Sequence, residues 1–225
     1  MKKIIVSTLL ISGLLLAGCV NNSSPQNGTG NTNNGSTSGT VSATVRPGAK
    51  KGATVKVAED QKVQWIGGKI GTTFTGTVDI LPDSVIQVNT QGNILWGKMT
   101  IAMKTIQENE SKTGGVVPHL LWTDFFNVEK ESTAVIDVIS VDYVVPEGGN
   151  TVTTSTTVTA NLTIKGITKV VTFPATLTQD NDFLLLSAQL DLKIKDYDIG
   201  TSSIGSAVLN DTFTIKLNRV TFVRY

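Results

Sequence analysis

The feature that most constrains the fold is a strict alternation of side chains over long stretches of the chain. Residues 151–164, 182–194 and 212–217 each place mostly apolar side chains on one parity and mostly polar ones on the other. A period of two is the repeat of a β-strand, whose successive side chains point to opposite faces. The sequence therefore predicts an all-β fold in which each strand has one apolar face.

The same reading predicts about eight strands. Further strands are expected at residues 62–66, 69–80, 93–104, 134–144 and 168–178, and one short helix between 117 and 126, where the alternation breaks. Several runs reach 11 to 14 residues, or roughly 36–46 Å of extended chain. Long antiparallel strands favour an extended up-and-down β-barrel, because closure removes exposed edges. Eight strands leave an interior that holds side chains or one slender ligand.

A transmembrane barrel has the same period with the polarity reversed. The aromatic content of 6% is low, and no girdles of Tyr and Trp stand at the strand ends. We therefore expect the apolar faces to point inward.

Composition excludes several functional classes. The formal net charge is +1, from 19 basic and 18 acidic residues without a basic cluster, which argues against nucleic-acid binding. A single Cys excludes an intramolecular disulfide or a thiolate-rich zinc site, and a single His leaves little for a His-dependent triad. Asp191, Asp196 and Asp198 lack the spacing of a calcium loop. We expect no enzyme activity, catalytic residue, metal or cofactor.

The N-terminus reads as an export signal. Lys2 and Lys3 precede an apolar run from 4 to 16, which is shorter than the roughly 20 residues of a spanning helix. The run ends in Leu16-Ala17-Gly18-Cys19, which resembles a bacterial lipobox. Residues 1–19 are thus expected to be a lipoprotein signal peptide and Cys19 the lipidated residue; the alternative is an ordinary signal peptide with a chance Cys.

Residues 20–44 are expected to be a disordered linker, since 21–40 contain only Asn, Ser, Gly, Thr, Gln and Pro. Residues 45–225 are expected to form the barrel domain. The protein is then exported and anchored to the cell envelope by its lipid. Because no Asp follows Cys19, the outer membrane, facing the periplasm, is the expected address in a cell with two membranes.

Five motifs occur in order through this domain: VQWIGGK at 63–69, FTGTV at 74–78, GKMTIAM at 97–103, HLLWTDFFNVE at 119–129 and ANLTIKGITKVVTFP at 160–174. Together they resemble the YceI-like polyisoprenoid-binding domain family of exported bacterial proteins. The resemblance implies a lipocalin-like extended barrel. It also implies a binding protein for a polyprenyl lipid or isoprenoid quinone, acting by sequestration or transfer.

Three positions depart from the family pattern. Phe74 stands where the family usually has His, Ala102 where it has Asp, and Lys193-Ile194 where it has Asp-Arg. Each change removes polar groups, so the ligand of this chain can differ from that of its relatives. A homodimer is a further possible partner state.

The candidate ligand-binding residues lie on the apolar faces of the long strands. They are Val152, Val158, Leu162, Leu184, Leu186, Leu190, Phe213 and Ile215, with Trp65 and Trp96 as residues of the mouth or wall. The alternative is that these side chains fill a solid core, and that the protein is a structural or protein-interaction module of the envelope.

Five other residues have either a functional or a structural interpretation. His119 can donate to a ligand head group or have a structural role, and Asp124 suits a turn or cap. Phe125 and Phe126 are either core side chains or part of the mouth. Gly166 is expected in a hairpin turn that needs its conformational freedom.

Overall fold

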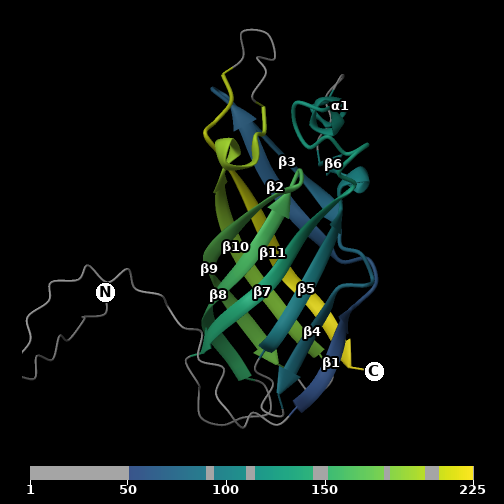
Figure 1. Ribbon diagram of the computed structural model, residues 1–225, viewed down its shortest axis with the longest axis vertical. Helices are drawn as coiled ribbons and strands as arrows, with labels where there is room; N and C mark the ends of the chain where they lie inside the picture. The colour runs from purple at the N-terminus through teal and green to yellow at the C-terminus, as the bar shows by residue number, and fades with distance from the viewer. Residues whose placement is uncertain are drawn as a thin grey trace, which may run out of the picture. The chain divides into compact units, whose positions relative to one another are not determined.

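The computed structural model describes residues 51–89, 94–109, 115–143, 152–179, 183–200 and 208–224. The expected signal peptide 1–19, with Cys19, and the whole of the expected linker 20–44 lie outside these ranges. The described chain is mainly β-structure wound into a barrel, with α1 and η2 at the end that we call upper (Figure 1).

The described residues contain eleven strands and three short helical turns. The strands are β1 (Lys51–Val57), β2 (Lys62–Lys69), β3 (Thr72–Asp79), β4 (Val85–Asn89), β5 (Ile94–Ala102), β6 (Gln107–Glu108), β7 (Thr133–Tyr143), β8 (Val152–Ile164), β9 (Ile167–Gln179), β10 (Phe183–Lys193) and β11 (Thr212–Arg224). The turns are the 3₁₀ helices η1 (Met103–Thr105) and η2 (Ile194–Tyr197) and the helix α1 (Val117–Leu121). The expected short helix is therefore confirmed. None of the described helices has the length and apolarity to span a membrane.

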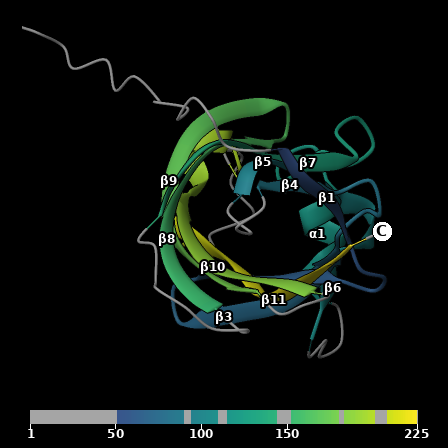
Figure 2. The ribbon, with the colours of Figure 1, turned by 90° about the horizontal axis from the view of Figure 1, so that it is seen from below.

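Eight of the strands form a closed antiparallel ring in the order β1-β4-β5-β7-β8-β9-β10-β11, with β11 paired back to β1. Figure 2 shows this ring from below, along the axis of the barrel. The eight-stranded up-and-down barrel expected from the alternation is confirmed. Strands β2, β3 and β6 extend the sheet from the edge of β11.

The outer edge of β11 is shared by two strands. Near the lower end Val57 pairs with Phe222, while further up Val63 pairs with Leu217. The chain thus leaves the ring after β1 and returns to the same edge as β2. Strands β1, β4 and the two-residue β6 were not expected from the sequence.

Two expected strand ends are wrong. The strand expected over 212–217 continues as β11 to Arg224. The sequence reading ended a strand at residue 66 and began the next at 69, but β2 continues through Gly67 and Gly68 to Lys69. The turn falls at Ile70 and Gly71. Gly71 has a φ of 80°, which side-chain-bearing residues rarely adopt, so the turn belongs there and not at the earlier glycines.

The ring is interrupted near its upper end. The pairing of β9 with β10 covers only Ala175–Gln179 with Leu184–Ala188. Strand β3 meets β5 through the single bridge between Ile80 and Ile101. Backbone hydrogen bonds therefore do not close the upper wall on their own, and side chains from other segments complete it.

The lower half of the barrel is filled by inward side chains. Val158, Leu186, Val220 and Phe222 are all buried there, and Phe222 is 0% exposed. These residues come from β8, β10 and β11, which are separated along the chain by β9 and by the long segment that contains η2. Their packing provides the hydrophobic core that stabilises the ring.

The β8–β9 hairpin turns on Lys165 and Gly166, whose φ values are 53° and 74°. Two positive φ angles in a two-residue loop are the requirement of a type I′ turn. The expected hairpin position of Gly166 is confirmed.

We predict that Gly166→Val lowers the free energy of unfolding by about 1–2 kcal/mol, because a branched side chain must adopt the left-handed region. Gly166→Asn is the control, since Asn visits this region readily. Urea denaturation of both variants measures the difference. Equal stability of the two variants would contradict the backbone explanation.

Candidate functional site

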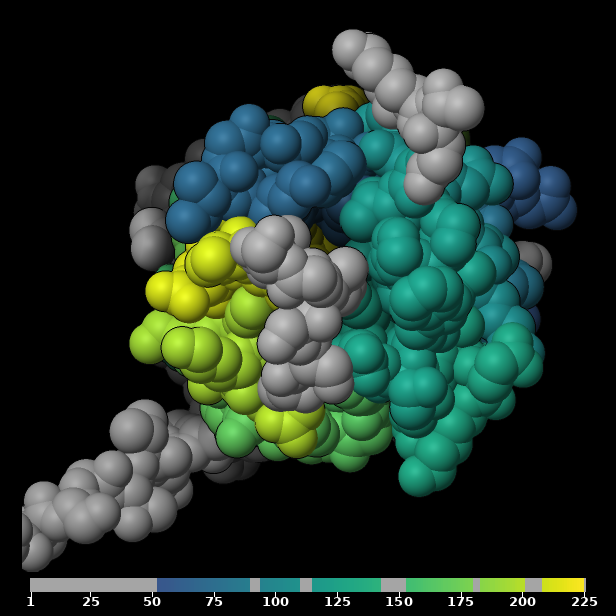
Figure 3. All heavy atoms as spheres, turned by 90° about the horizontal axis from the view of Figure 1, so that it is seen from above, coloured from purple at the N-terminus to yellow at the C-terminus, as the bar shows by residue number. Residues whose placement is uncertain are grey.

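A cavity of about 720 Å³ lies in the upper part of the barrel. This is within the range of ordinary ligand sites, about 300–1,000 Å³. Its walls come from β2, β3 and β11, from the upper ends of β5, β7 and β8, and from the segment that carries α1. Figure 3 views the upper face, with β2 and β3 on one side and the segment after residue 115 on another.

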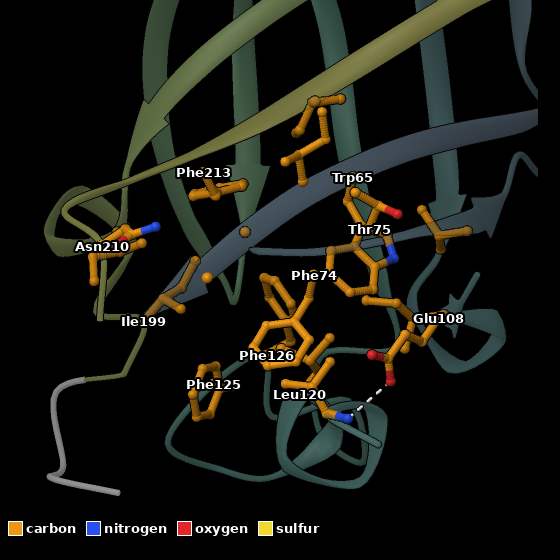
Figure 4. A pocket seen from close by; sticks show the side chains of 18 of the residues that line it. Trp65, Phe74, Thr75, Glu108, Leu120, Phe125, Phe126, Ile199, Asn210 and Phe213 are labelled. Carbon is orange, nitrogen blue, oxygen red and sulfur yellow. Dashed lines mark hydrogen bonds between the residues drawn. The ribbon is translucent and has the colours of Figure 1, made fainter. Parts of the chain in front are cut away.

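Strand alternation places the wall side chains. Trp65 and Val63 line the cavity from β2, Phe213 and Ile215 from β11, and Leu162 from β8. Figure 4 shows Trp65 and Phe213 on the barrel side of the cavity. The wall is therefore mostly apolar, which suits a hydrophobic ligand.

Gly67 leaves part of the cavity open. It continues the inward parity of Val63 and Trp65, and a Cβ built on it meets nothing within 4 Å. Its φ is not in the left-handed region. A larger side chain at this position would extend into the cavity without a backbone clash.

Gly76 on β3 allows the indole of Trp65 to approach the sheet. A Cβ at Gly76 would lie 2.6 Å from Trp65 Cε2 and Cζ2 and 1.8 Å from the carbonyl oxygen of Gln107. Trp65 Nε1 donates a hydrogen bond to that carbonyl oxygen at 3.1 Å. The close approach and the hydrogen bond together fix this part of the wall.

The upper side of the cavity is covered by residues 116–131, which we call the cap segment. Leu120, Phe125 and Phe126 line the cavity from it, and Figure 4 shows them opposite Phe213. Glu108 Oε2 accepts a hydrogen bond from the Val116 backbone N–H at 3.0 Å (Figure 4). Both Phe125 and Phe126 border the cavity, and Phe125 is at the same time buried in the hydrophobic core, so the two roles expected from the sequence do not exclude each other.

Hydrogen bonds hold the cap segment to two other loops. The carbonyl oxygen of Asp124 accepts from the Gly200 backbone N–H at 2.7 Å and from Lys165 Nζ at 3.3 Å. Lys165 Nζ also donates to the Asp198 carbonyl oxygen at 2.6 Å. The lysine of the β8–β9 turn thus joins the cap segment to the loop after η2.

Polar side chains lie at the mouth. Lys69, Glu108, Asn109 and Asn210 border the cavity where it reaches the surface. A ligand with an apolar chain and a polar head would find its hydrogen-bond partners at this end.

His119 and Tyr197 carry buried polar atoms with no hydrogen-bond partner among the described residues, His119 Nδ1 and the Tyr197 hydroxyl. His119 borders the cavity and packs edge-on against Trp122, with ring centroids 4.6 Å apart. Burial, and then the charge of Asp196, raises the pKa of Tyr197 to about 12, but Tyr197 does not border the cavity. His119 therefore borders the cavity with its ring, while its Nδ1 atom is itself buried.

The ten ligand-binding candidates from the sequence differ in whether their side chains border the cavity. Trp65, Leu162, Phe213 and Ile215 line the cavity. Val158, Leu184, Leu186 and Leu190 are buried but do not border it. Trp96 on β5 is 42% exposed and lies apart from the cavity, and the Val152 side chain is outside the described residues. A ligand-binding role stays a prediction for each of these ten residues.

The departures from the family pattern fall partly in the wall. Phe74 and Ile194 line the cavity, whereas Ala102 and Lys193 do not. Apolar side chains therefore occupy wall positions where polar ones were expected from the resemblance. Gly67, Val78 and Leu120 are among the lining residues that the sequence did not single out. Gly67 lies two residues after Trp65 and faces the same side of β2, so strand alternation was the signal that could have identified it.

No group of three or more His, Cys, Asp or Glu side chains within the described ranges could hold a metal ion. The chemistry available at the cavity is hydrogen bonding at the mouth and apolar contact along the wall.

Comparisons with known proteins agree with the fold. A family model described as the YceI-like domain matches residues 31–221. The crystal structure of Burkholderia cenocepacia BcnA is similar with a TM-score of 0.57 and 20% identity, over 75% of this chain and 99% of that chain. A polyisoprenoid binding domain from Saccharophagus degradans, implicated in plant cell wall breakdown, has a TM-score of 0.55 and 15% identity, over 76% of this chain and 98% of that chain. No curated protein matches the chain.

We predict that Gly76→Val destabilises the protein by about 1–3 kcal/mol, because the new side chain overpacks the site and displaces Trp65 from Gln107. Gly67→Val is the matched control, since its Cβ enters open space. Thermal unfolding followed by near-ultraviolet circular dichroism measures both. The contact is refuted if the two variants unfold at the same temperature.

Proposed function

Since the chain belongs to the YceI-like domain family, we propose that it is an exported, lipid-anchored binding protein that sequesters or carries a long-chain isoprenoid lipid or quinone. The observation that carries this proposal is the apolar cavity of about 720 Å³ in the upper barrel. It favours a binding protein over a solid barrel that acts only through its surface.

The physical reason is the cost of exposing an apolar chain to water. Each buried CH₂ group contributes about 0.8 kcal/mol, so a polyprenyl chain does not leave a membrane without an apolar enclosure. Trp65, Phe213 and the cap residue Phe126 supply such an enclosure. The polyisoprenoid binding domain from Saccharophagus degradans has the same fold, which supports an isoprenoid as the ligand.

The polar groups at the mouth suit a head group. Asn109 and Asn210 offer amides, and Lys69 offers an ammonium group. A quinone carbonyl or a prenol hydroxyl could bond to these groups while the chain lies deeper. The proposed activity is binding and release, without turnover.

We predict that Gly67→Phe lowers the amount of bound lipid at least about tenfold, because the ring occupies the cavity and removes contacts worth several CH₂ groups. The protein is purified from a bacterial host without detergent. Native mass spectrometry gives the bound mass, and solvent extraction identifies the lipid.

Val170→Phe is the matched control, since Val170 is 66% exposed on the outer face of β9. It should carry as much lipid as the unchanged protein. If Gly67→Phe folds and retains its full lipid load, or if the unchanged protein never acquires an isoprenoid when incubated with one, the proposal is wrong.

The anchor is proposed from the lipobox-like Leu16-Ala17-Gly18-Cys19. Two or more acyl chains make membrane attachment stable. We predict that Cys19→Ala abolishes incorporation of a labelled fatty acid and moves the protein out of the membrane fraction. Asn22→Ala in the linker should leave both unchanged. A Cys19→Ala protein that is still labelled and still sediments with membranes contradicts the anchor.

A further inference from the structure

The cavity occupies only the upper part of the barrel. Strand β8 has 13 residues, yet only Leu162 and Ile164, near its upper end, border the cavity. No residue of the 11-residue strand β10 borders it. The cavity is thus shorter than the strands that surround it.

The lower limit of the cavity can be identified from strand alternation. Two residues further down each wall strand, the inward positions are Met99 after Ile101, Ile136 after Ala134, Ala160 after Leu162 and Leu217 after Ile215. These four residues, which we call the floor, are at most 5% exposed, and none of them borders the cavity. They separate it from the packed lower half.

Below the floor the barrel is packed with buried side chains, among them Val158, Leu186, Val220 and Phe222. A second pocket, beside Val55 and Leu184, is a void of only about 10 Å³, which is about the space of a single water molecule. A chain that enters from the upper end therefore ends at the floor.

The volume sets how much chain fits. A cavity of about 150 Å³ holds one benzene ring. By this measure the 720 Å³ available here accommodates roughly five such units, or about 30 carbon atoms. That corresponds to about six isoprene units.

We propose that the cavity is a length-limited chamber, which encloses up to about 30 carbons of an isoprenoid, with the end of the chain against the floor and the polar head at the mouth. This inference rests on the proposed function and adds the length class of its ligand. Carbons beyond this length stay outside the cavity in water or in the membrane.

The orientation follows from the distribution of polar groups. Lys69, Asn109 and Asn210 border the mouth, whereas Met99, Ile136 and Leu217 at the floor carry no hydrogen-bonding side chain. A polar head at the floor would be buried without partners. The head therefore lies at the mouth and the chain end at the floor.

The test uses the full protein and all-trans prenols of about 15, 20, 30 and 45 carbons, chosen to bracket the capacity of about 30. Each prenol is presented at the same mole fraction in phosphatidylcholine vesicles, and the amount bound to protein is measured after the vesicles are removed. In this design a carbon that enters the cavity moves from the apolar interior of the bilayer to an apolar protein interior, so its transfer changes the free energy of binding little. Only carbons that protrude into water lower the binding.

We expect similar binding of the prenols up to about 30 carbons and at least about tenfold lower binding of the 45-carbon prenol. Leu217→Ala deepens the floor and should raise the binding of the longest prenol several-fold relative to the 20-carbon one. Leu186→Ala is the matched control, because Leu186 is buried in the lower half without bordering the cavity; it should leave this ratio unchanged. Gly67→Leu fills the cavity from its wall and should shift the limit to shorter chains.

Three outcomes are distinguished. A drop at the longest prenol that Leu217→Ala relieves, or that Gly67→Leu moves to shorter chains, supports the chamber. Equal binding of the 20-carbon and 45-carbon prenols overturns the length limit and leaves the carrier function standing. Folded protein that binds no prenol of any length overturns both proposals.

Discussion

The edge of β11 is the constraint on which the rest of the structure depends. Its last residues pair with β1 and close the ring, and its first half pairs with β2. One edge of β11 thus pairs with two different strands. The wall of the barrel is therefore built from different strands at its two ends. At the lower end, β1 and β4 complete an eight-stranded ring. At the upper end, β2 pairs with β11 in place of β1, and β3 pairs with β2.

This difference explains why the molecule has both a packed core and a cavity. In the lower half Val158, Leu186 and Phe222 are buried in the hydrophobic core and do not border the cavity. In the upper half the pairing of β9 with β10 stops at Ala175 and Ala188, so the cap segment and η2 complete the enclosure. Lys165 stabilises that arrangement, since it donates hydrogen bonds to carbonyls of both the cap segment and the loop after η2.

The sequence predicted the barrel and its inward faces, because alternation depends only on local parity. It could not predict which inward residues pack and which line a cavity. Leu162 and Val158 have the same parity on one strand, but Leu162 borders the cavity and Val158 does not, and this depends on strands paired from distant parts of the chain. Trp96 could not be placed either, because a register shift between β4 and β5 buries Ile94 and Gly97 and leaves Trp96 exposed.

The central claim is that an apolar chain lies in the upper barrel and ends above a packed core. The most direct measurement is a crystal structure of the protein with an isoprenoid that carries bromine at the end of its chain, located by anomalous scattering. The account predicts bromine density near Leu162 and Ile215, above Leu217. Bromine density between Val158 and Leu186, or only on the outer surface, would contradict it.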